Sequence, residues 1–223
     1  MCFSATASFT AVVVIGAIGV ATLAQKPEKR RLPFALIPLV FAVHQAIEGA
    51  IWLSLGGDAA PPGALVVAYL FLAQIFWPTF TPLSVLLFEQ GARRRWALWI
   101  LLAAGVFVSG VMAFILVQHD YAVTIVGHSL RYATDHEFEA RLSGLYLVTT
   151  TAPFLIARHR YVMAFGGAVL FSSVITQMVF YETAASVWCF FAALSSVFVF
   201  LHIRRQSRLL KNYSMPSALP KSE

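Results

Sequence analysis

Seven long apolar runs, separated by short polar connections, restrict what this sequence can fold into. Each run approaches the roughly 20 residues that an α-helix needs to cross the hydrocarbon layer of a bilayer. Inside that layer the backbone must satisfy its own hydrogen bonds, and the strands of a membrane barrel would alternate apolar and polar residues, which these runs do not. We therefore predict an all-α, polytopic membrane protein with seven transmembrane helices. The predicted helices are Thr6–Ala24, Pro33–Leu55, Ala64–Phe88, Trp96–Val117, Leu142–Ala157, Tyr161–Tyr181 and Val187–Ile203.

The composition agrees with a bilayer as the main solvent. The chain has 223 residues, of which 59% are hydrophobic and 12% are charged, whereas about 25% of the residues in a soluble domain are charged. We predict one transmembrane domain over residues 1–211 and a polar, disordered cytoplasmic tail over residues 212–223.

The basic residues determine the predicted orientation. Of the sixteen lysines and arginines, all but Arg131 and Arg141 lie in four short clusters or in the C-terminal tail, and the clusters occupy alternate connections. Membrane proteins keep such clusters on the cytoplasmic side. We therefore predict an external N-terminus and a cytoplasmic C-terminus. The net charge of +6 follows from this topology and does not indicate a nucleic-acid partner.

A pair of ionisable residues deep in the second predicted helix is the strongest functional feature. His44 lies about 16 Å from either end of that helix, and Glu48 is one turn nearer the outside. Ionisable groups at membrane depth cost about 2.5–3.5 kcal/mol to insert and are usually functional. The spacing of four places both on one helix face, with Gln45 beside them and Trp52 one turn further. The pair can bind a metal or transfer a proton, or it can form a structural hydrogen bond between helices.

The third predicted helix carries a matching, broken face. Gln74, Trp77, Pro78, Thr81 and Pro82 recur there at helical spacing. Each proline removes a backbone donor, which a membrane helix tolerates where a cavity or a neighbouring helix satisfies the freed carbonyl. Gln74 and Trp77 are therefore candidate ligand-binding residues opposite His44, with a simple packing kink as the alternative.

The predicted topology places both cysteines on the external side. Cys2 lies at the N-terminus, and Cys189 lies near the outer end of the seventh helix. Three interpretations are open. The two can form a disulfide, they can complete a metal site with His44 and Glu48, or Cys189 can be a small buried residue and Cys2 incidental.

The remaining polar residues of interest lie in the connections. The external connection Gln118–Arg141 is longer than a simple connector, so we predict a lid, a cap or an interfacial helix there. Its His128 and its segment Asp135–Glu137 are candidate additional metal ligands or charges of a lid, with a solvated loop face as the alternative. His159 and His202 are predicted at the cytoplasmic interface.

The sequence lacks the motifs of several known membrane sites. A retinal Schiff base requires a lysine in the seventh helix. None of the lysines of this chain lies there, so no retinal is expected. The motifs H-E-x-x-H, His-x-x-x-His and G-x-S-x-G and the Walker motif are also absent. The lysines of the chain are Lys26, Lys29, Lys211 and Lys221.

Three segments of the chain form a distinctive combination. They are Met1-Cys2-Phe3-Ser4-Ala5, His44-Gln45-x-x-Glu48-x-x-x-Trp52 and Trp188-Cys189-Phe190-Phe191. Over most of its length the chain resembles a widespread bacterial family of small integral membrane proteins that begin Met-Cys-Phe-Ser or Met-Cys-Trp-Ser. That family has no established activity, so the resemblance implies no function. It does imply a shared pattern and favours a common site reached from outside. The residues of that pattern are Cys2, His44, Gln45, Glu48 and Trp52.

On these grounds we hypothesise a membrane-embedded metal-binding protein, an enzyme that acts on a small or lipid-like molecule at an outward-opening site. Cys2, His44 and Cys189 would be ligands of a transition metal such as zinc, iron or copper, and Glu48 would be a ligand or a general base. One alternative is a proton- or cation-coupled transporter in which His44 and Glu48 form the relay. Another is a non-enzymatic receptor or scaffold. Membrane lipid is an expected partner in each case.

Overall fold

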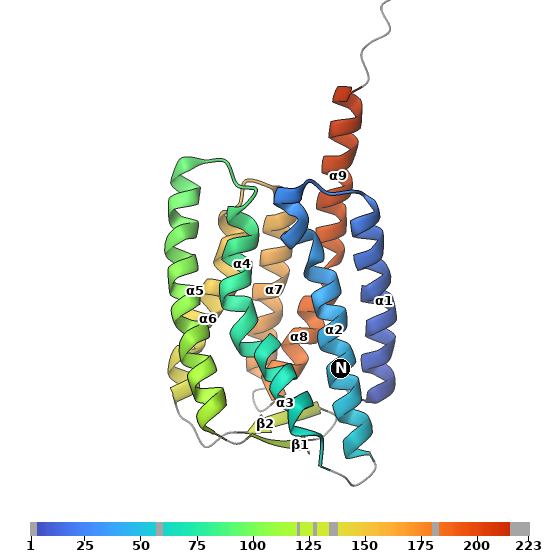
Figure 1. Ribbon diagram of the computed structural model, residues 1–223, viewed down its shortest axis with the longest axis vertical. Coiled ribbons are helices and arrows are strands. Elements are labelled where there is room, and N and C mark those ends of the chain that lie inside the picture. The colour runs from blue at the N-terminus through green and yellow to red at the C-terminus, as the bar shows by residue number, and fades with distance from the viewer. Residues whose placement is uncertain are drawn as a thin grey trace, which may run out of the picture.

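Long helices run side by side and form one bundle (Figure 1). The computed structural model describes residues 4–56, 60–119, 121–126, 129–133, 138–179 and 183–214. In chain order its elements are α1 Ala5–Ala24, the 3₁₀ turn η1 Lys29–Arg31, α2 Leu32–Leu55, α3 Gly63–Leu70, the π-helix η2 Phe71–Phe76, α4 Trp77–Leu86, α5 Ala92–Gln118, β1 Ala122–Val126, β2 Ser129–Ala133, α6 Phe138–Ile156, α7 Arg160–Val179, α8 Ala184–Leu194 and α9 Val197–Ser214.

Each of the seven predicted apolar runs coincides with helix in the structure. Five of them are single helices, whereas the third is divided into α3, η2 and α4 and the seventh into α8 and α9. Among the described residues, six stretches are long and apolar enough to cross a membrane, and the seventh, Leu142–Ile156, is apolar but shorter. The last turns of α9 extend past the bundle (Figure 1). Residues 215–223 of the predicted tail lie outside the described residues.

Local sequence explains where the first two helices begin. The side-chain oxygen of Ser4 accepts a hydrogen bond from the N–H of Ala7 at 3.2 Å and so caps α1. Pro33 lies in the first turn of α2, where its missing N–H leaves no hydrogen bond unmade. Of the six apolar stretches, the one that contains α2 is the most buried. α2 is therefore the central helix, and it carries the predicted pair.

The third stretch is broken near its prolines, as predicted, and the break takes the form of a π-helix. η2 ends two residues before Pro78, whose ring nitrogen has no N–H to offer the preceding turn. Neighbouring helices supply donors instead. The Ala73 carbonyl accepts a hydrogen bond from the Tyr146 hydroxyl of α6, and the Ile75 carbonyl accepts one from the Ser109 hydroxyl of α5 at 2.6 Å. These two hydrogen bonds connect η2 to two neighbouring helices.

A β-hairpin lies across one end of the bundle (Figure 1). β1 and β2 pair antiparallel, with Val126 opposite Ser129. Leu130 is fully buried and belongs to one apolar cluster with Ile51 of α2 and Tyr69 of α3. The long connection between α5 and α6 therefore forms a cap over this end of the bundle, and its described residues form two strands where an interfacial helix was one expectation. The predicted ligands His128 and Asp135–Glu137 lie outside the described residues.

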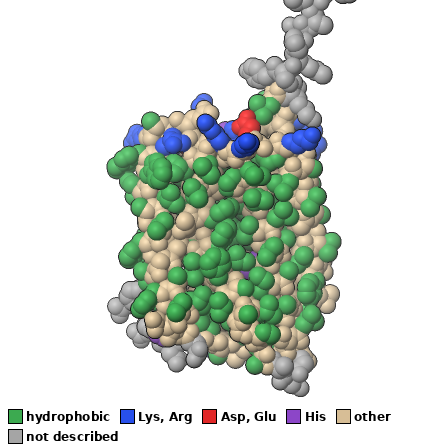
Figure 2. All heavy atoms as spheres, in the orientation of Figure 1, with side chains coloured by type: hydrophobic (Ala, Val, Ile, Leu, Met, Phe, Trp, Pro, Cys, Tyr) green, Lys and Arg blue, Asp and Glu red, His purple; other side chains and the backbone are tan. Residues whose placement is uncertain are grey.

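The surface divides into an apolar side and a basic end. Hydrophobic side chains cover the side of the bundle that faces the viewer in Figure 2, and Lys and Arg gather at the end opposite the hairpin. Large apolar side chains are strongly exposed on several helices, as with Val117, which is 82% exposed, and Met178, which is 81% exposed. An apolar surface of this extent is typical of a protein that lipid surrounds.

Candidate functional site

The predicted pair lies in the interior, on the inward face of α2. His44, Gln45 and Glu48 are all fully buried. The side-chain amide of Gln45 donates a hydrogen bond to Oε2 of Glu48 at 3.2 Å. Trp52, one turn further along this face, is half-buried and packs against the cluster that contains Leu130. The spacing read from the sequence therefore brings these four residues onto one buried face.

A row of three aromatic rings connects the pair to the hairpin. The His44 imidazole lies 4.4 Å from the Tyr69 ring, centroid to centroid. Tyr69 in turn stacks on Tyr132 of β2, with centroids 4.3 Å apart and planes 8° from parallel. Stacked aromatic rings stabilise their contact by about 0.5–1.5 kcal/mol beyond the area they bury. A movement of the hairpin would therefore be transmitted to His44 through the side chain of Tyr69.

Several buried polar atoms of α2 and of the broken third stretch have no hydrogen-bond partner among the described residues. They include both ring nitrogens of His44, Oε1 of Gln74 and the indole nitrogens of Trp52 and Trp77. The backbone of Tyr69 lies close to the imidazole, but neither ring nitrogen makes a hydrogen bond of normal geometry. A buried polar atom without a partner costs about 1–3 kcal/mol. Buried polar atoms without a partner are rare in folded proteins, and a bound molecule, water or ion that completes their hydrogen bonds is one explanation.

Cys189 lies beside this group on α8. Its thiol is free and buried, and it belongs to the same apolar cluster as Tyr69 and Leu130. The side chains of Glu48 and Tyr69 are close enough to interact with it. The structure therefore brings Cys189 to the predicted site, whereas Cys2 lies outside the described residues.

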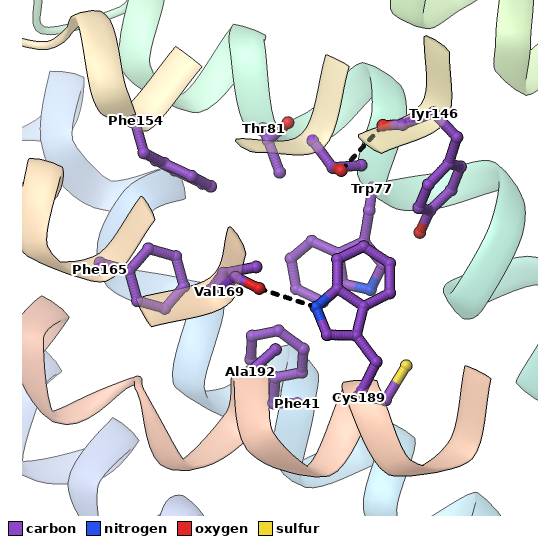
Figure 3. Close-up of a pocket in the computed structure, with 11 residues that line it drawn as sticks. Phe41, Trp77, Thr81, Tyr146, Phe154, Phe165, Val169, Cys189 and Ala192 are labelled. Carbon is purple, nitrogen blue, oxygen red and sulfur yellow. Dashed lines mark hydrogen bonds between the residues drawn. The ribbon is translucent and has the colours of Figure 1, made fainter. Parts of the chain in front are cut away.

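An apolar cavity lies on the other side of Cys189. Its volume is about 30 Å³, room for one or two water-sized groups. Figure 3 shows Phe41, Trp77 and Cys189 at its wall. Trp77 also stacks on Phe41 of α2 with centroids 4.4 Å apart. The predicted face of the third helix is thus packed against α2, next to the site.

Packed aromatic rings close the bundle toward its basic end. Phe34 of α2 has three phenylalanine neighbours, with centroid distances of 5.5 Å to Phe88, 6.1 Å to Phe154 and 6.3 Å to Phe165. Phe154 and Phe165 lie 4.9 Å apart. These rings fill the core between the site and the basic end.

The described residues do not support the predicted metal centre. Within residues 4–214, apart from the segments left undescribed, no three His, Cys, Asp or Glu side chains are grouped so that they could hold a metal ion. Glu48 is engaged with Gln45, and Cys2 and His128 lie outside the described residues. His44 and Glu48 are therefore neighbours in a polar site, and its use of a metal depends on ligands from those segments.

Sequence reasoning missed the two tyrosines that complete the site. Tyr69 lies in an apolar run and Tyr132 in the long connection before α6, and neither has a motif around it. A phenol within a membrane helix is a weak signal, because tyrosine is also common at membrane interfaces. The alternation of Leu130 and Tyr132 with polar neighbours was the available sign of a strand with one buried face.

The chain was compared with family models, curated proteins and solved structures. A family of unknown function, DUF6629, matches residues 1–213. The chain belongs to this family. The comparisons with curated proteins and with solved structures gave no match. Membership agrees with the expected resemblance to an uncharacterised family, and the role of each site residue is argued from this chain alone.

Replacement of His44 by leucine is expected to raise the stability of the ligand-free protein. The change removes two buried nitrogens that lack hydrogen-bond partners, and each such nitrogen destabilises the folded protein by about 1–3 kcal/mol. An increase of about 1 kcal/mol in the free energy of unfolding raises Tm by roughly 2–4 °C at this chain length. Thermal unfolding in detergent, followed by circular dichroism, measures the shift. Tyr146→Phe is the matched control, because its hydroxyl does have a partner in Ala73 and its loss should lower Tm. A lower Tm in His44→Leu would mean that the imidazole is structural.

Proposed function

We propose that the chain is an integral protein of a bacterial inner membrane, with seven membrane-crossing helices, an external N-terminus and a cytoplasmic C-terminus. Two observations support this proposal. The described apolar stretches have the required length, six of them fully, and the basic side chains gather at one end of the bundle (Figure 2). In this orientation the hairpin and the buried pair face outward.

The function that the site supports best is binding and chemical conversion of a small polar or lipid-like molecule that enters from outside. The observation that carries this proposal is the fully buried His44, with both nitrogens unpartnered among the described residues, one helical turn from the Glu48 carboxylate. A bound molecule would supply the missing hydrogen-bond partners. Glu48 would accept a proton as general base and Gln45 would hold its carboxylate in place. The apolar cavity beside Cys189 would receive a methyl or alkyl group.

A transition-metal form of this site is a narrower proposal. The imidazole of His44, the carboxylate of Glu48 and the thiol of Cys189 are suitable donors for zinc, iron or copper. The described chain does not group three of them, so the fourth donor, Cys2, would have to complete the set. The unpartnered ring nitrogens are what fits a ligand role for His44.

Metal analysis and thermal-shift binding test both forms. We expect a ligand or metal from a panel of zinc, iron, copper and small amines and acids to raise the Tm of the wild type. The shift should be lost in Glu48→Gln, which keeps the shape of the side chain but cannot accept the proton or hold the metal. Val43→Ala on the exposed side of α2 is the control and should keep the shift. If a member of the panel raises Tm but the protein holds no stoichiometric metal, only the metal form of the proposal is ruled out. If the panel raises the Tm of Glu48→Gln as much as that of the wild type, the site itself is contradicted.

A proton- or cation-coupled transporter is the second candidate, and one observation favours it. The third stretch is interrupted by η2 and by two prolines near the level of the pair, as in the broken helices at transporter binding sites. The packed rings around Phe34 oppose it, because a transporter needs access from both sides. A pH-dependent flux in liposomes that Glu48→Gln abolishes would favour the transporter over the enzyme.

A further inference from the structure

A second polar site lies at the basic end, far from the hairpin. A cleft of about 440 Å³ opens there between the connection before α2 and the connection after α4, within the range of about 300–1,000 Å³ that small-molecule sites occupy. Its charged lining residues are Glu28, Arg30, Arg31, Glu89 and Arg95. It shares no lining residue with the cavity beside Cys189, so an inference from it is independent of the proposed outer site.

The two carboxylates of the cleft already have partners within the protein. Glu28 pairs with Arg31 at 2.7 Å, the one ion pair found within the described residues. Glu89 is 3% exposed, and its carboxylate accepts hydrogen bonds from the backbone N–H groups of Gln90, Gly91 and Arg158 at 3.2, 3.3 and 3.0 Å. Glu89 therefore joins two connections of the bundle and is not paired with an arginine side chain in the described chain.

The arginines of the cleft have N–H donors that remain available to a ligand. Arg31 is mostly buried, with its side chain 13% exposed, and its Nε has no hydrogen-bond partner among the described residues. Arg95 uses Nη1 to bond the carbonyls of Leu86 and Glu89 at 3.0 and 3.1 Å, which holds its guanidinium at the cleft. Arg30 is exposed at the rim. A guanidinium held in this way matches the oxygens of phosphate by paired hydrogen bonds.

We propose that this cleft binds a phosphate-bearing anion, with Arg30, Arg31 and Arg95 as its ligands. Two sources share that chemistry: the headgroup of an anionic phospholipid in the adjacent leaflet and free phosphate in the cytoplasm. The lining residues Leu87 and Phe88 give the cleft an apolar wall, on which the glycerol part of a headgroup would rest.

His159 provides a reporter of the bound anion. Burial lowers its pKa below the usual 6.5, and the charges of Arg31, Arg158 and Arg205 lower it further, with Glu89 acting in the opposite sense. The His159 ring faces His202, with centroids 4.8 Å apart. An anion held by Arg31 would partly cancel the positive charge that His159 experiences, so binding would raise the pKa of His159.

The test is a titration of His159 by NMR in nanodiscs made of phosphatidylcholine. One arm adds inorganic phosphate to the buffer, and a second replaces part of the lipid by phosphatidylglycerol. His159→Gln assigns the signal. We expect the pKa of His159 to rise in at least one arm. Arg30→Gln and Arg31→Gln should each raise the amount of probe needed for half of this change about tenfold, the loss expected for a charge-assisted hydrogen bond.

Arg93→Gln is the matched control, because Arg93 is exposed on the same end and does not line the cleft. It should leave the half-saturation point unchanged. A rise with inorganic phosphate assigns the site to free phosphate, and a rise with phosphatidylglycerol alone assigns it to lipid. No rise in either arm, or an equal loss in Arg93→Gln, would overturn the proposal, the latter because it would reflect only the general charge of the surface.

Discussion

Gly105→Ala is expected to destabilise the bundle by about 2–3 kcal/mol, the upper part of the range for overpacked cores. α5 passes so close to α4 that a Cβ on Gly105 would collide with the backbone carbonyl of Pro78. That carbonyl would normally bond the N–H four residues on, but the residue there is Pro82, which has none. α5 therefore approaches an unbonded carbonyl, and only a glycine leaves room for it. The clash is with backbone, so no side-chain rotation can relieve it.

Gly110→Ala is the control for this prediction. Gly110 lies on the same helix, and no other atom lies within 4 Å of the position of an added Cβ. Its replacement should be neutral or stabilising by up to about 1 kcal/mol, because alanine favours helix. Thermal unfolding of both variants in the same detergent gives the comparison. Equal Tm values would contradict the close contact between α4 and α5, and with it the anchoring of η2 through Ser109.

Tyr132→Ala is expected to raise the rate at which a small maleimide modifies Cys189 by about tenfold or more. Tyr132 stacks on Tyr69, and loss of the stack and of its buried area would favour opening of the hairpin by more than about 1.4 kcal/mol. The experiment uses Cys2→Ser, which leaves Cys189 as the single thiol of a chain with two cysteines. The rate of modification is read by mass spectrometry.

Arg131→Ala tests whether the aromatic stack or the strand as a whole shields Cys189 from modification. Arg131 is the neighbour of Tyr132 on β2 but is exposed, so its loss should leave the rate near that of the parent protein. If both variants react at the parent rate, the hairpin is not the barrier in front of Cys189. If both react faster, the strand rather than the aromatic stack holds the cap closed.

The helices could be predicted from the sequence because apolar length is a local signal. α1, α2 and α5 begin and end within a few residues of the predicted runs. The π-helix could not be predicted, because its hydrogen-bond partners Ser109 and Tyr146 lie 34 and 73 residues along the chain from the carbonyls that they bond. A proline indicates that a helix must be irregular, but neighbouring helices decide the form.

The site could be predicted in part for the same reason. His44 and Glu48 were identified because a buried ionisable residue is rare in an apolar run. Tyr69 and Tyr132 gave no such signal, since their contribution depends on the hairpin folding back over α3. The contact of His159 with His202 likewise follows from packing of α9 beside α7, which no local pattern indicates.

The sidedness of Cys189 modification tests the central claim, an outward-opening site beneath the hairpin, most directly. Spheroplasts and inverted vesicles that contain the Cys2→Ser, Tyr132→Ala protein would be treated with a maleimide that cannot cross membranes. The account predicts modification of Cys189 in spheroplasts, where the outer face is exposed, and little in inverted vesicles, where the rings around Phe34 intervene. Modification in inverted vesicles alone would contradict both the orientation and the direction of access.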